Sequence, residues 1–332
     1  MKISLIGGGS WGITLAQVLA DNGNDCLVYD INNEFVESIN KNHIHPFFPE
    51  CLLPDKIKAT TNLSEAVNFS RYLLLAVPTK VMRDIVLKNI NNILTEKKVF
   101  INVSKGIEPE TLKRVSQIVK EEINKEYLEG FVVLTGPSHA EEVIKRKLTV
   151  LVSASENETL AKEVQLLFSN DKYLRVYTSN DLIGCEIGGA IKNAIAVVSG
   201  ISTGLGLGEN ARAALISRGI LEIVMIVEAL GGKKETAFGL TGIGDLIVTA
   251  SSENSRNFQA GKKIGYGENV IDVVNNSVQT VEGVRTIVAA HQIALKYNLT
   301  LPIIDTAYEV LFNNLDIKDA IKKLLSRSLK ME

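Results

Sequence analysis

The amino-acid sequence predicts an α/β protein in which a doubly wound parallel sheet is followed by an all-helical C-terminal domain. Short apolar segments alternate with segments of helical periodicity as far as residue 177, the pattern of repeated strand–helix–strand units. Beyond residue 180 the periodicity is helical only. The 332 residues are enough for two domains that each have a core. We therefore predict one domain over residues 1–180 and a second over residues 181–332.

The first element is an apolar strand at residues 2–6, which runs directly into Gly7-Gly8-Gly9-Ser10-Trp11-Gly12, and a helical segment follows at residues 13–21. The G-x-G-x-x-G pattern is informative here because it lies between a predicted strand and a predicted helix. The first glycine allows a tight turn, the second lets a pyrophosphate approach the backbone, and the third lets the helix lie close to the strand. The N–H groups at the start of the helix then face the phosphates. The stretch predicts a Rossmann-type dinucleotide site rather than a glycine-rich turn without a ligand.

A second strand at residues 26–29 ends in Asp30. An acidic residue about 20 positions beyond the glycines is placed to accept hydrogen bonds from the adenosine ribose. The same carboxylate would repel a 2′-phosphate. Asp30 therefore predicts a preference for NAD(H).

The remaining elements of the first domain are predicted in order along the chain. Asn33 is a candidate N-cap for a helix through Ile39, and residues 41–54, which include three prolines, are predicted to be irregular. Strands are predicted at residues 57–59, 72–77, 99–103, 131–134, 149–152 and 174–177. Helices are predicted at residues 81–94, 110–123 and 159–168. The wholly apolar run at 72–77 is typical of a parallel strand that is covered on both faces.

Ligands of such sheets bind outside the carboxyl ends of the strands. Lys105 follows one predicted strand, between Val103 and Gly106, where a tight turn would direct it toward a ligand. The alternative is a solvated surface lysine. The segment from Gly136 to Ser138 follows another strand and belongs to the same predicted site.

The second domain has helical segments at residues 181–201, 211–230, 281–297 and 303–311. Lys192 lies there among small apolar residues, where burial would disfavour its ammonium form and make it a usable acid or base. Gly188, one turn earlier on the same side, would leave room for a ligand. The alternative is a lysine that reaches the surface from an apolar helix.

Asp245 is a lone charge among glycines and apolar residues. A buried carboxylate needs a cationic partner, and we predict that this partner is Lys192. The alternative is an N-cap for the helix that follows. Nearby, the planar arginine and the amide in Ser255-Arg256-Asn257 suit a phosphate or a carboxylate, although this signal alone is weak.

Composition excludes several classes of function. Lys and Arg number 36 against 38 Asp and Glu, a net charge of -2, which argues against nucleic acid as the main partner. No apolar run is expected to reach the roughly 18 residues of a membrane span, and the first strand leaves no room for a signal peptide. Three sparse cysteines, at 26, 51 and 185, fit reduced thiols in a cytoplasm. His43 and His45 lack further ligands nearby, so we predict no metal site.

Seven segments together resemble the bacterial type of NAD(P)-dependent glycerol-3-phosphate dehydrogenase, over nearly the whole chain. They are Gly7 to Gly12, Ser104-Lys105-Gly106-Ile107-Glu108, Thr135-Gly136-Pro137-Ser138-His139-Ala140-Glu141, Gly188-Gly189-Ala190-Ile191-Lys192-Asn193, Gly239-Leu240-Thr241-Gly242-Ile243-Gly244-Asp245-Leu246, Ser255-Arg256-Asn257 and Val281-Glu282-Gly283-Val284. Seven motifs in order are far more specific than the glycine pattern alone.

The resemblance implies roles for individual residues. Lys192 is similar to the family's catalytic acid/base, Lys105 to the lysine between substrate and nicotinamide, and Asp245 to the acid that holds the catalytic lysine. The implied substrate contacts are Lys105, Gly136, Ser138, Lys192, Asp245, Ser255, Arg256 and Asn257. With the residues taken from the glycine pattern, the cofactor contacts are Gly7, Gly9, Ser10, Trp11, Gly12, Asp30, Lys105, Ala140, Arg256 and Glu282.

The implied reaction reduces dihydroxyacetone phosphate, a small phosphorylated three-carbon substrate, in a crevice between the domains. Lys192 would donate a proton to the C2 oxygen while Lys105 stabilises its negative charge. The product, sn-glycerol 3-phosphate, would serve phospholipid synthesis, and the family also implies a homodimer and common use of NADP(H).

Three places depart from the family pattern. Asp30 stands where a small residue is usual, commonly followed by a basic one, and Phe47-Phe48-Pro49 stands where Tyr-Leu-Pro is usual. Thr280, two residues before Glu282, stands where an apolar residue is usual, so it is not among the predicted site residues. Two alternatives stay open. One is a related two-domain reductase of the β-hydroxyacid or ketopantoate type, and the other is a catalytically silent nucleotide-binding protein.

Overall fold

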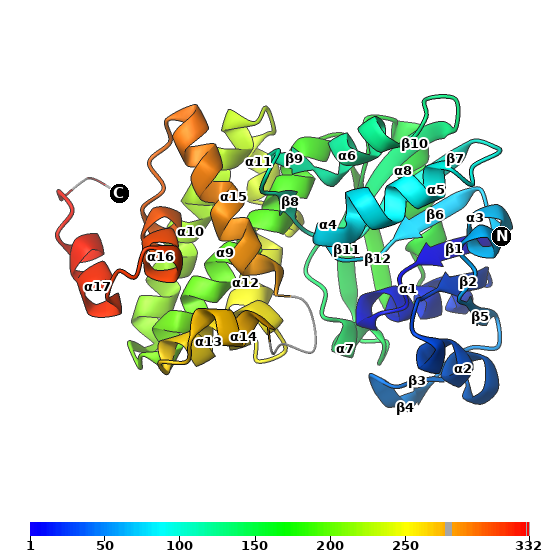
Figure 1. The fold of residues 1–332 in the computed structure, drawn as a ribbon, viewed down its shortest axis with the longest axis horizontal. Helices are drawn as coiled ribbons and strands as arrows, with labels where there is room; N and C mark the ends of the chain where they lie inside the picture. The colour runs from blue at the N-terminus through cyan, green and yellow to red at the C-terminus, as the bar shows by residue number, and fades with distance from the viewer. Residues whose placement is uncertain (276–280, 330, 332) are drawn as a thin grey trace. The chain divides into compact units, whose positions relative to one another are not determined.

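The computed structural model describes residues 1–275, 281–329 and 331 (Figure 1). The chain folds into two compact units. The first consists of Met1–Lys105 and Lys113–Glu186, and the second of Gly106–Leu112 and Ile187–Glu332. The second unit therefore takes a short segment from within the first, a return that the sequence analysis did not anticipate.

An eight-stranded sheet forms the first unit. Its strands are β1 (Lys2–Ile6), β2 (Asp25–Tyr29), β5 (Ile57–Thr60), β6 (Tyr72–Leu75), β7 (Lys98–Asn102), β10 (Leu128–Thr135), β11 (Thr149–Ala154) and β12 (Leu174–Ser179). Their order is β12-β11-β10-β7-β6-β1-β2-β5, so the direction of the strand order reverses at β1. All neighbours are parallel except β10 and β11, which are antiparallel. The predicted doubly wound sheet is confirmed, and its one antiparallel pair was not predicted.

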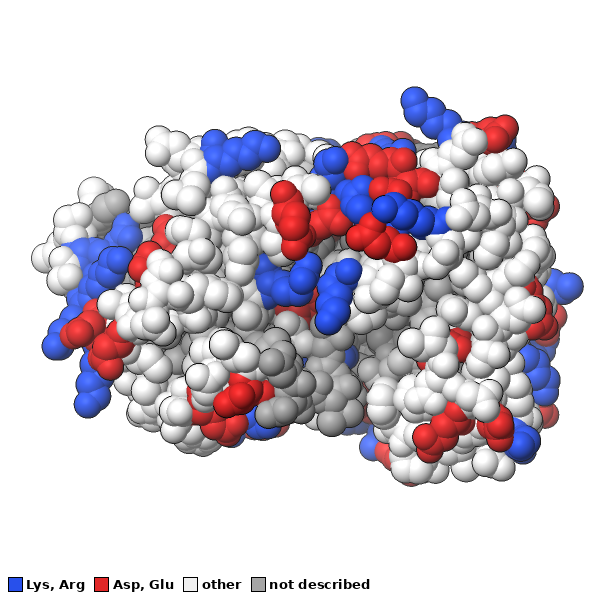
Figure 2. All heavy atoms as spheres, viewed as in Figure 1, with Lys and Arg blue, Asp and Glu red and all other residues white. Residues whose placement is uncertain are grey.

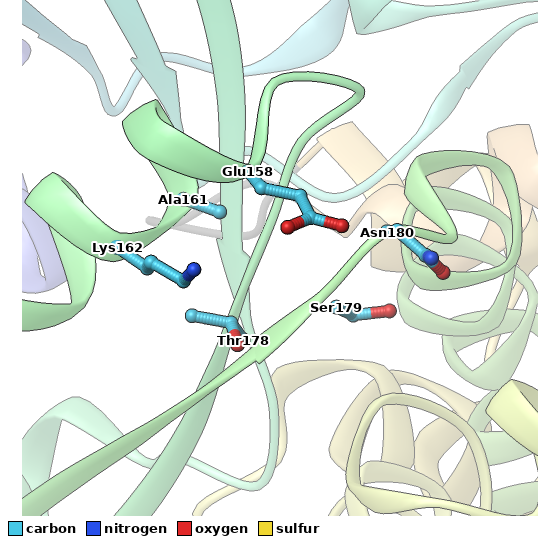
Figure 3. A pocket seen from close by; sticks show the side chains of 6 residues that line it. All are labelled: Glu158, Ala161, Lys162, Thr178, Ser179 and Asn180. Carbon is cyan, nitrogen blue, oxygen red and sulfur yellow. The ribbon is translucent and has the colours of Figure 1, made fainter.

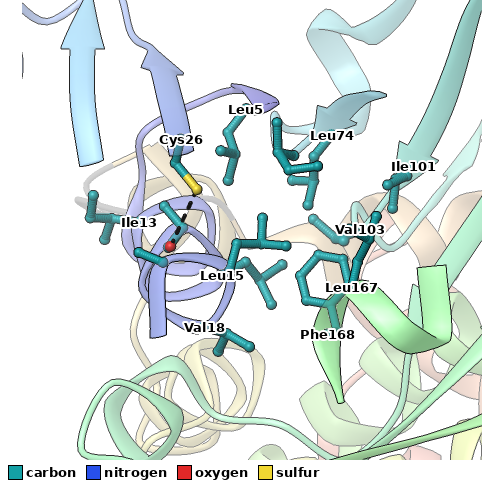
Figure 4. Close-up of a cluster of buried hydrophobic side chains, with 14 of the residues drawn as sticks. Leu5, Ile13, Leu15, Val18, Cys26, Leu74, Ile101, Val103, Leu167 and Phe168 are labelled. Atoms are coloured by element: carbon teal, nitrogen blue, oxygen red, sulfur yellow. Dashed lines mark hydrogen bonds between the residues drawn. The ribbon is translucent and has the colours of Figure 1, made fainter. Parts of the chain in front are cut away.

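Helices cover this sheet. They are α1 (Ser10–Asp21), α2 (Asn33–Asn42), α3 (Leu63–Phe69), α4 (Thr79–Val81), the π-helix η1 (Met82–Leu87), α5 (Lys88–Asn91), α6 (Val115–Glu122), α7 (Ala140–Val143) and α8 (Glu158–Phe168). Figure 4 shows the core between α1, α8 and the strands, where Leu15 of α1 and Phe168 of α8 are both fully buried. Cys26 Sγ donates to the carbonyl oxygen of Ala16 at 3.6 Å, which ties β2 to α1. This packing fixes the start of α1 beside the end of β1.

Three local predictions are wrong. Asn32, not Asn33, caps α2 by accepting from the N–H of Glu34. The segment 41–54, predicted to be irregular, forms a hairpin of β3 (Ile44–His45) and β4 (Phe48–Leu52). The helix predicted from residue 110 begins only at Val115, because Leu112 has a φ of 59°, which an α-helix does not accommodate. Two short strands, β8 (Ile107–Glu108) and β9 (Lys113–Arg114), take its place.

Helices make up almost all of the second unit. They are α9 (Leu182–Gly204), α10 (Gly208–Ala229), α11 (Lys234–Ala237), the π-helix η2 (Leu240–Gly244), α12 (Asp245–Ala250), α13 (Arg256–Gly265), α14 (Val270–Asn275), α15 (Glu282–Tyr297), α16 (Pro302–Phe312) and α17 (Ile317–Leu325). The predicted all-helical region is confirmed, with more helices than its periodicity predicts. The first turn of α9 belongs to the first unit, which ends at Glu186.

Helix α9 needs a correction to the sequence analysis. Its length and a mean hydropathy of 1.4 would suffice to cross a membrane, although no such run was expected. In the structure 83% of its most apolar window is buried by other parts of the chain. It is therefore packed as a core helix.

Charges of both signs are intermixed on the face of the molecule that Figure 2 shows. Among the ion pairs of the first unit, Arg83 pairs with Glu121 at 2.9 Å and with Glu122 at 2.5 Å. This mixture agrees with the net charge of -2.

Candidate active site

The glycine turn has the shape that a dinucleotide phosphate requires. Gly7 has a φ of +108°, a conformation that side chains rarely adopt. A Cβ on Gly12 would lie 2.0 Å from the carbonyl oxygen of Gly7, so only glycine lets α1 start this close to β1. A Cβ on Gly9 would meet nothing within 4 Å, and within the described chain no side chain caps the first turn of α1. The open space and uncapped helix start fit a phosphate group.

Asp30 lies beside this turn. Its Oδ2 accepts from the N–H of Gly8 at 2.7 Å, and its Oδ1 accepts from the N–H of Asn32 at 2.8 Å. A carboxylate has about four acceptor positions, so these two bonds leave capacity for a ribose hydroxyl. Asp30 thus has a backbone-holding role that the sequence analysis did not foresee, and its ribose contact stays a prediction.

Lys105, Gly136 and Ser138 form one group in the first unit. The Nζ atom of Lys105 donates to the carbonyl oxygen of Gly136 at 3.2 Å, and the hydroxyl of Ser138 donates to the same oxygen at 3.0 Å. Gly136 has a φ of +141°, which turns the chain after β10. Ala140 is buried at the start of α7, and Trp11 is half-buried in the first turn of α1. The structure thus brings together the strand-end residues that the sequence singled out.

Lys192 is buried in α9, with 5% of its surface exposed. Its Nζ donates to Oδ1 of Asp245 at 2.9 Å and to Oγ1 of Thr249 at 2.6 Å. The predicted Lys192–Asp245 pair is confirmed, and the alternative of a lysine at the surface is wrong. Asp245 is also not an N-cap, because the cap position of α12 is Gly244.

Thr249 is a partner of Lys192 that the sequence analysis did not select. It lies four residues after Asp245 on α12, so both side chains are on the same side of the helix. Its hydroxyl also lies 3.3 Å from Oδ1 of Asp245. The spacing was visible in the sequence, but threonine at i+4 is too common to single out without knowing that Lys192 faces α12.

Gly188 does not leave room for a ligand, contrary to prediction. A Cβ there would lie 2.9 Å from the carbonyl oxygen of Thr241 and 3.3 Å from Cα of Gly242. The backbone of η2 therefore fills the space beside Gly188. Since η2 continues directly into α12, this close approach places Asp245 next to Lys192.

Ser255-Arg256-Asn257 begins α13. Ser255 is buried and caps the helix by accepting from the N–H of Phe258 at 3.2 Å. The amide of Asn257 donates to Oδ1 of Asn193 at 3.0 Å and accepts from the N–H of Gly283 at 2.9 Å. Through Asn257, these bonds connect Asn193, which follows Lys192, to Gly283, which follows Glu282. Asn193 is a second residue that sequence reasoning did not select, and Arg256 is exposed.

A hollow of about 370 Å³ lies elsewhere in the first unit, between α8 and β12 (Figure 3). It is lined by Glu158, Ala161, Lys162, Thr178, Ser179 and Asn180. The predicted site residues are not among these. Glu158 and Lys162 give this hollow both charges, and none of the residues singled out for the reaction lines it.

Comparison with known proteins identifies the family. The model for the N-terminus of NAD-dependent glycerol-3-phosphate dehydrogenase matches residues 2–161, and the model for its C-terminus matches residues 181–322. A glycerol-3-phosphate dehydrogenase (NAD(P)+) of Acholeplasma laidlawii is 64% identical over 332 residues, covering 100% of this chain and 99% of the relative. One from Phytoplasma mali is 50% identical over the same shares of both chains.

A solved structure agrees with these relatives. The crystal structure of glycerol-3-phosphate dehydrogenase from Coxiella burnetii matches with a TM-score of 0.92 at 30% identity, over 98% of this chain and 99% of that chain. Sequence and fold therefore agree on the family. The chain belongs to the NAD-dependent glycerol-3-phosphate dehydrogenase family.

Proposed function

We propose that this chain interconverts dihydroxyacetone phosphate and sn-glycerol 3-phosphate with a nicotinamide dinucleotide. The observation that carries the proposal is the buried Lys192, held by Asp245 and Thr249, in a chain of this family. When bound, the reduced nicotinamide supplies the hydride for C2 of the substrate. The protein must then bind and orient the substrate and deliver a proton to the C2 oxygen.

Lys192 is the proton donor in this proposal. Burial alone disfavours an ammonium, but the carboxylate of Asp245 at 2.9 Å favours it, so a proton is held on Nζ until the C2 oxygen becomes negative. Hydrogen bonds to Asp245 and Thr249 fix the direction of Nζ. In the reverse reaction the same nitrogen accepts the proton from the C2 hydroxyl.

Lys105 provides positive charge for the same oxygen. Its position against the carbonyl oxygen of Gly136 holds its Nζ at the end of the strand, next to Ser138. A fixed cation stabilises charge that develops in the transition state. We assign Gly136 and Ser138 to substrate binding.

The substrate phosphate binds at the start of α13 in this proposal. Ser255, Arg256 and Asn257 occupy that helix start, where partial positive charge gathers. Asn257 fixes the position of its turn through Asn193 and Gly283. Arg256 supplies the full positive charge and also borders the cofactor.

The cofactor contacts are Gly7, Gly9, Ser10, Trp11, Gly12, Asp30, Lys105, Ala140, Arg256 and Glu282. We propose that NADH is preferred over NADPH because of Asp30.

Residues 1–180 act as the dinucleotide-binding domain and residues 181–332 as the catalytic domain. The protein acts in the cytoplasm as a homodimer and supplies glycerol 3-phosphate for phospholipids, in keeping with three cysteines that form no disulfide.

The test follows the loss of reduced-nicotinamide absorbance with dihydroxyacetone phosphate, and with dihydroxyacetone for comparison. We expect fast oxidation with the phosphorylated substrate only. Lys192→Met should lower kcat by about 10²–10⁴-fold, the usual range for losing a general acid, while NADH binding is kept. The matched control is Lys162→Met, at the exposed hollow beside α8, which should leave kcat unchanged. Equal rates with both substrates, or an active Lys192→Met variant, would contradict the proposal.

A further inference from the structure

The last helix of the second unit, α17, leaves large apolar side chains in solvent. It spans Ile317–Leu325 and packs against α16. Its apolar residues at 317, 320, 321 and 324 are buried or half-buried. Leu325, by contrast, is 79% exposed, and Leu329 and Met331, just beyond the helix, are fully exposed. Packing therefore accounts for one side of α17 and leaves these three side chains in water.

Positive charge gathers on the same segment. Residues 317–331 contain five Lys and Arg residues and one Asp, whereas the whole chain has a net charge of -2. Figure 2 shows Lys and Arg side chains over the part of the molecule where Figure 1 draws α17. Among the described residues, the exposed cations of the segment are Lys318, Lys322, Lys323 and Arg327. The near-neutral total thus conceals a basic segment.

The protein itself neutralises little of this charge. Lys322 pairs with Asp319 at 3.2 Å, but both side chains are more than half exposed. An exposed pair of this kind contributes little. Within the described part of the chain, the other three cations form no ion pair. The segment therefore carries positive charge that an external partner can neutralise.

Helix α17 presents these groups in a preformed arrangement. Asp316 caps it by accepting from the N–H groups of Lys318 at 2.8 Å and Asp319 at 3.2 Å. Lys318 and Lys322 lie seven and three residues before Leu325, so they share its side of the helix. Because the helix is already formed, binding does not have to order it, which lowers the cost of association.

We propose that the α17 strip, formed by Leu325, Leu329, Met331 and the four exposed cations, docks on an anionic lipid surface. Charge complementarity carries the inference, because the strip is basic on a chain whose net charge is negative. Peripheral binding to a membrane needs two signals, apolar side chains that enter the interface and cations that meet anionic headgroups. The strip supplies both, and its docking does not depend on the proposed reaction.

Other occupants fit the strip less well. In a two-fold contact between two copies of the chain the same patch meets itself, so its cations would repel one another. The strip has no aromatic side chain on which a nucleic-acid base could stack. Lys322 and Lys323 are successive, so they point about 100° apart around the helix. That spread suits a broad negative surface better than a single acidic side chain.

The experiment sediments the full-length chain with vesicles of phosphatidylglycerol and phosphatidylcholine, or of phosphatidylcholine alone. We expect binding to the anionic vesicles only, and release at about 1 M salt, where the Debye length is about 3 Å. Lys322→Gln combined with Lys323→Gln should lower the partition coefficient by about 30-fold, since each cation near the surface contributes about fivefold. Leu325→Ser combined with Leu329→Ser should lower it by about tenfold and keep the salt dependence.

The matched control is Lys233→Gln combined with Lys234→Gln. These two lysines are also successive and exposed, at the start of α11, and their loss changes the net charge equally. Binding should stay as in the parent, because no exposed leucine pair accompanies them. Equal loss in this control would show that only the total charge matters and would overturn the role of the strip.

Two further results would also overturn it. One is a parent protein that does not sediment with anionic vesicles at low salt. The other is a leucine variant that changes the oligomeric state in analytical ultracentrifugation but not vesicle binding, which would make the strip a subunit contact. If the leucine variant fails to fold, the lysine pair decides. Activity with dihydroxyacetone phosphate is assayed separately, so an inactive chain that binds the vesicles would contradict the proposed reaction and support the docking surface.

Discussion

Asp30 combines two functions in one carboxylate. It holds the N–H groups of Gly8 and Asn32, and in our proposal it also accepts from the ribose. Replacement by alanine would remove both at once and disturb the turn for either dinucleotide. Asparagine keeps one acceptor oxygen and removes only the charge, so it separates the two functions.

We predict that Asp30→Asn shifts preference toward NADPH. Removing a unit charge near the 2′-phosphate should raise the ratio of kcat/KM for NADPH to that for NADH by about tenfold, or about 1.4 kcal/mol. The control is Asp25→Asn, an exposed carboxylate at the other end of β2, which should leave the ratio unchanged. An unchanged ratio in Asp30→Asn would remove the electrostatic argument for NADH.

Thr249 allows a test of how Lys192 is oriented. Thr249→Val keeps the side-chain shape but removes the oxygen that accepts from Nζ at 2.6 Å. Losing a hydrogen bond to a charged group costs about 1.5–3 kcal/mol, so we expect kcat to fall by about 10- to 100-fold with little change in KM. Thr249→Ser keeps the oxygen and should restore most of the rate. Equal rates in the valine and serine variants would show that Asp245 alone is sufficient.

At the scale of elements, the contact of α9 with η2 positions Asp245 beside Lys192. No side chain at position 188 fits between the two backbones, since a Cβ would lie 2.9 Å from the carbonyl oxygen of Thr241. Short π-helical segments occur frequently at functional sites. Here η2 ends at Gly244 and Asp245 comes next.

We predict that Gly188→Ala moves η2 away from α9. Overpacking of this kind costs about 1–3 kcal/mol in the free energy of unfolding. The displacement also lengthens the Lys192–Asp245 distance, so kcat should fall while dinucleotide binding is unchanged. Thermal unfolding and steady-state kinetics check both effects. A variant with unaltered kcat would show that Asp245 does not depend on this contact.

Helix α16 is capped by a carboxylate from α10. Glu222 is buried and accepts from the N–H groups of Ile303 at 2.6 Å and Ile304 at 3.0 Å. Burial raises the pKa of Glu222 from 4.5 to about 7, despite those bonds, with Asp305 adding to the rise. Between these two values the folded state holds more protons than the unfolded state. Stability from this group is therefore complete below pH 4.5 and is lost as the pH rises through about 7.

We predict that Glu222→Gln flattens this part of the stability profile. The shift of about 2.5 pKa units corresponds to about 3 kcal/mol between pH 4.5 and 8. Glutamine does not ionise, so its free energy of unfolding should vary less over that range. Denaturant titrations at pH 5 and pH 8 measure the difference. A parent protein that is no less stable at pH 8 than at pH 5 would contradict the assignment unless another group compensates, which the glutamine variant would reveal.

Prediction from sequence was most accurate where a local pattern, or the cost of an unpaired buried charge, decided the outcome. The glycine turn, the buried parallel strands and the Lys192–Asp245 pair follow from local patterns or from the cost of a lone buried charge. It failed where distant segments decide the outcome. The space beside Gly188 is filled by a helix about 50 residues away, and the acceptor role of Thr249 depends on which side of α12 faces α9.

The whole molecule shows the same limit. The sequence predicts an irregular segment at the β3–β4 hairpin, because its prolines interrupt the alternation of apolar and polar residues that marks a strand. The hairpin nevertheless forms and carries the buried His45. The helix expected from residue 110 is interrupted at Leu112, whose positive φ no propensity rule would assign to leucine. The segment around it belongs to the second unit, where Glu110 lies 3.9 Å from Arg285 of α15.

Because Gly106–Leu112 belongs to the second unit, the chain is constrained in how it can be truncated or recombined. A gene fragment that encodes only residues 187–332 lacks the segment that packs on α15. Residues 187–332 are therefore not a complete structural unit. If they are exchanged with those of another dehydrogenase at a single crossover point, residues 106–112 of one parent pack against α15 of the other. A chimera must therefore take residues 106–112 and residues 187–332 from the same parent.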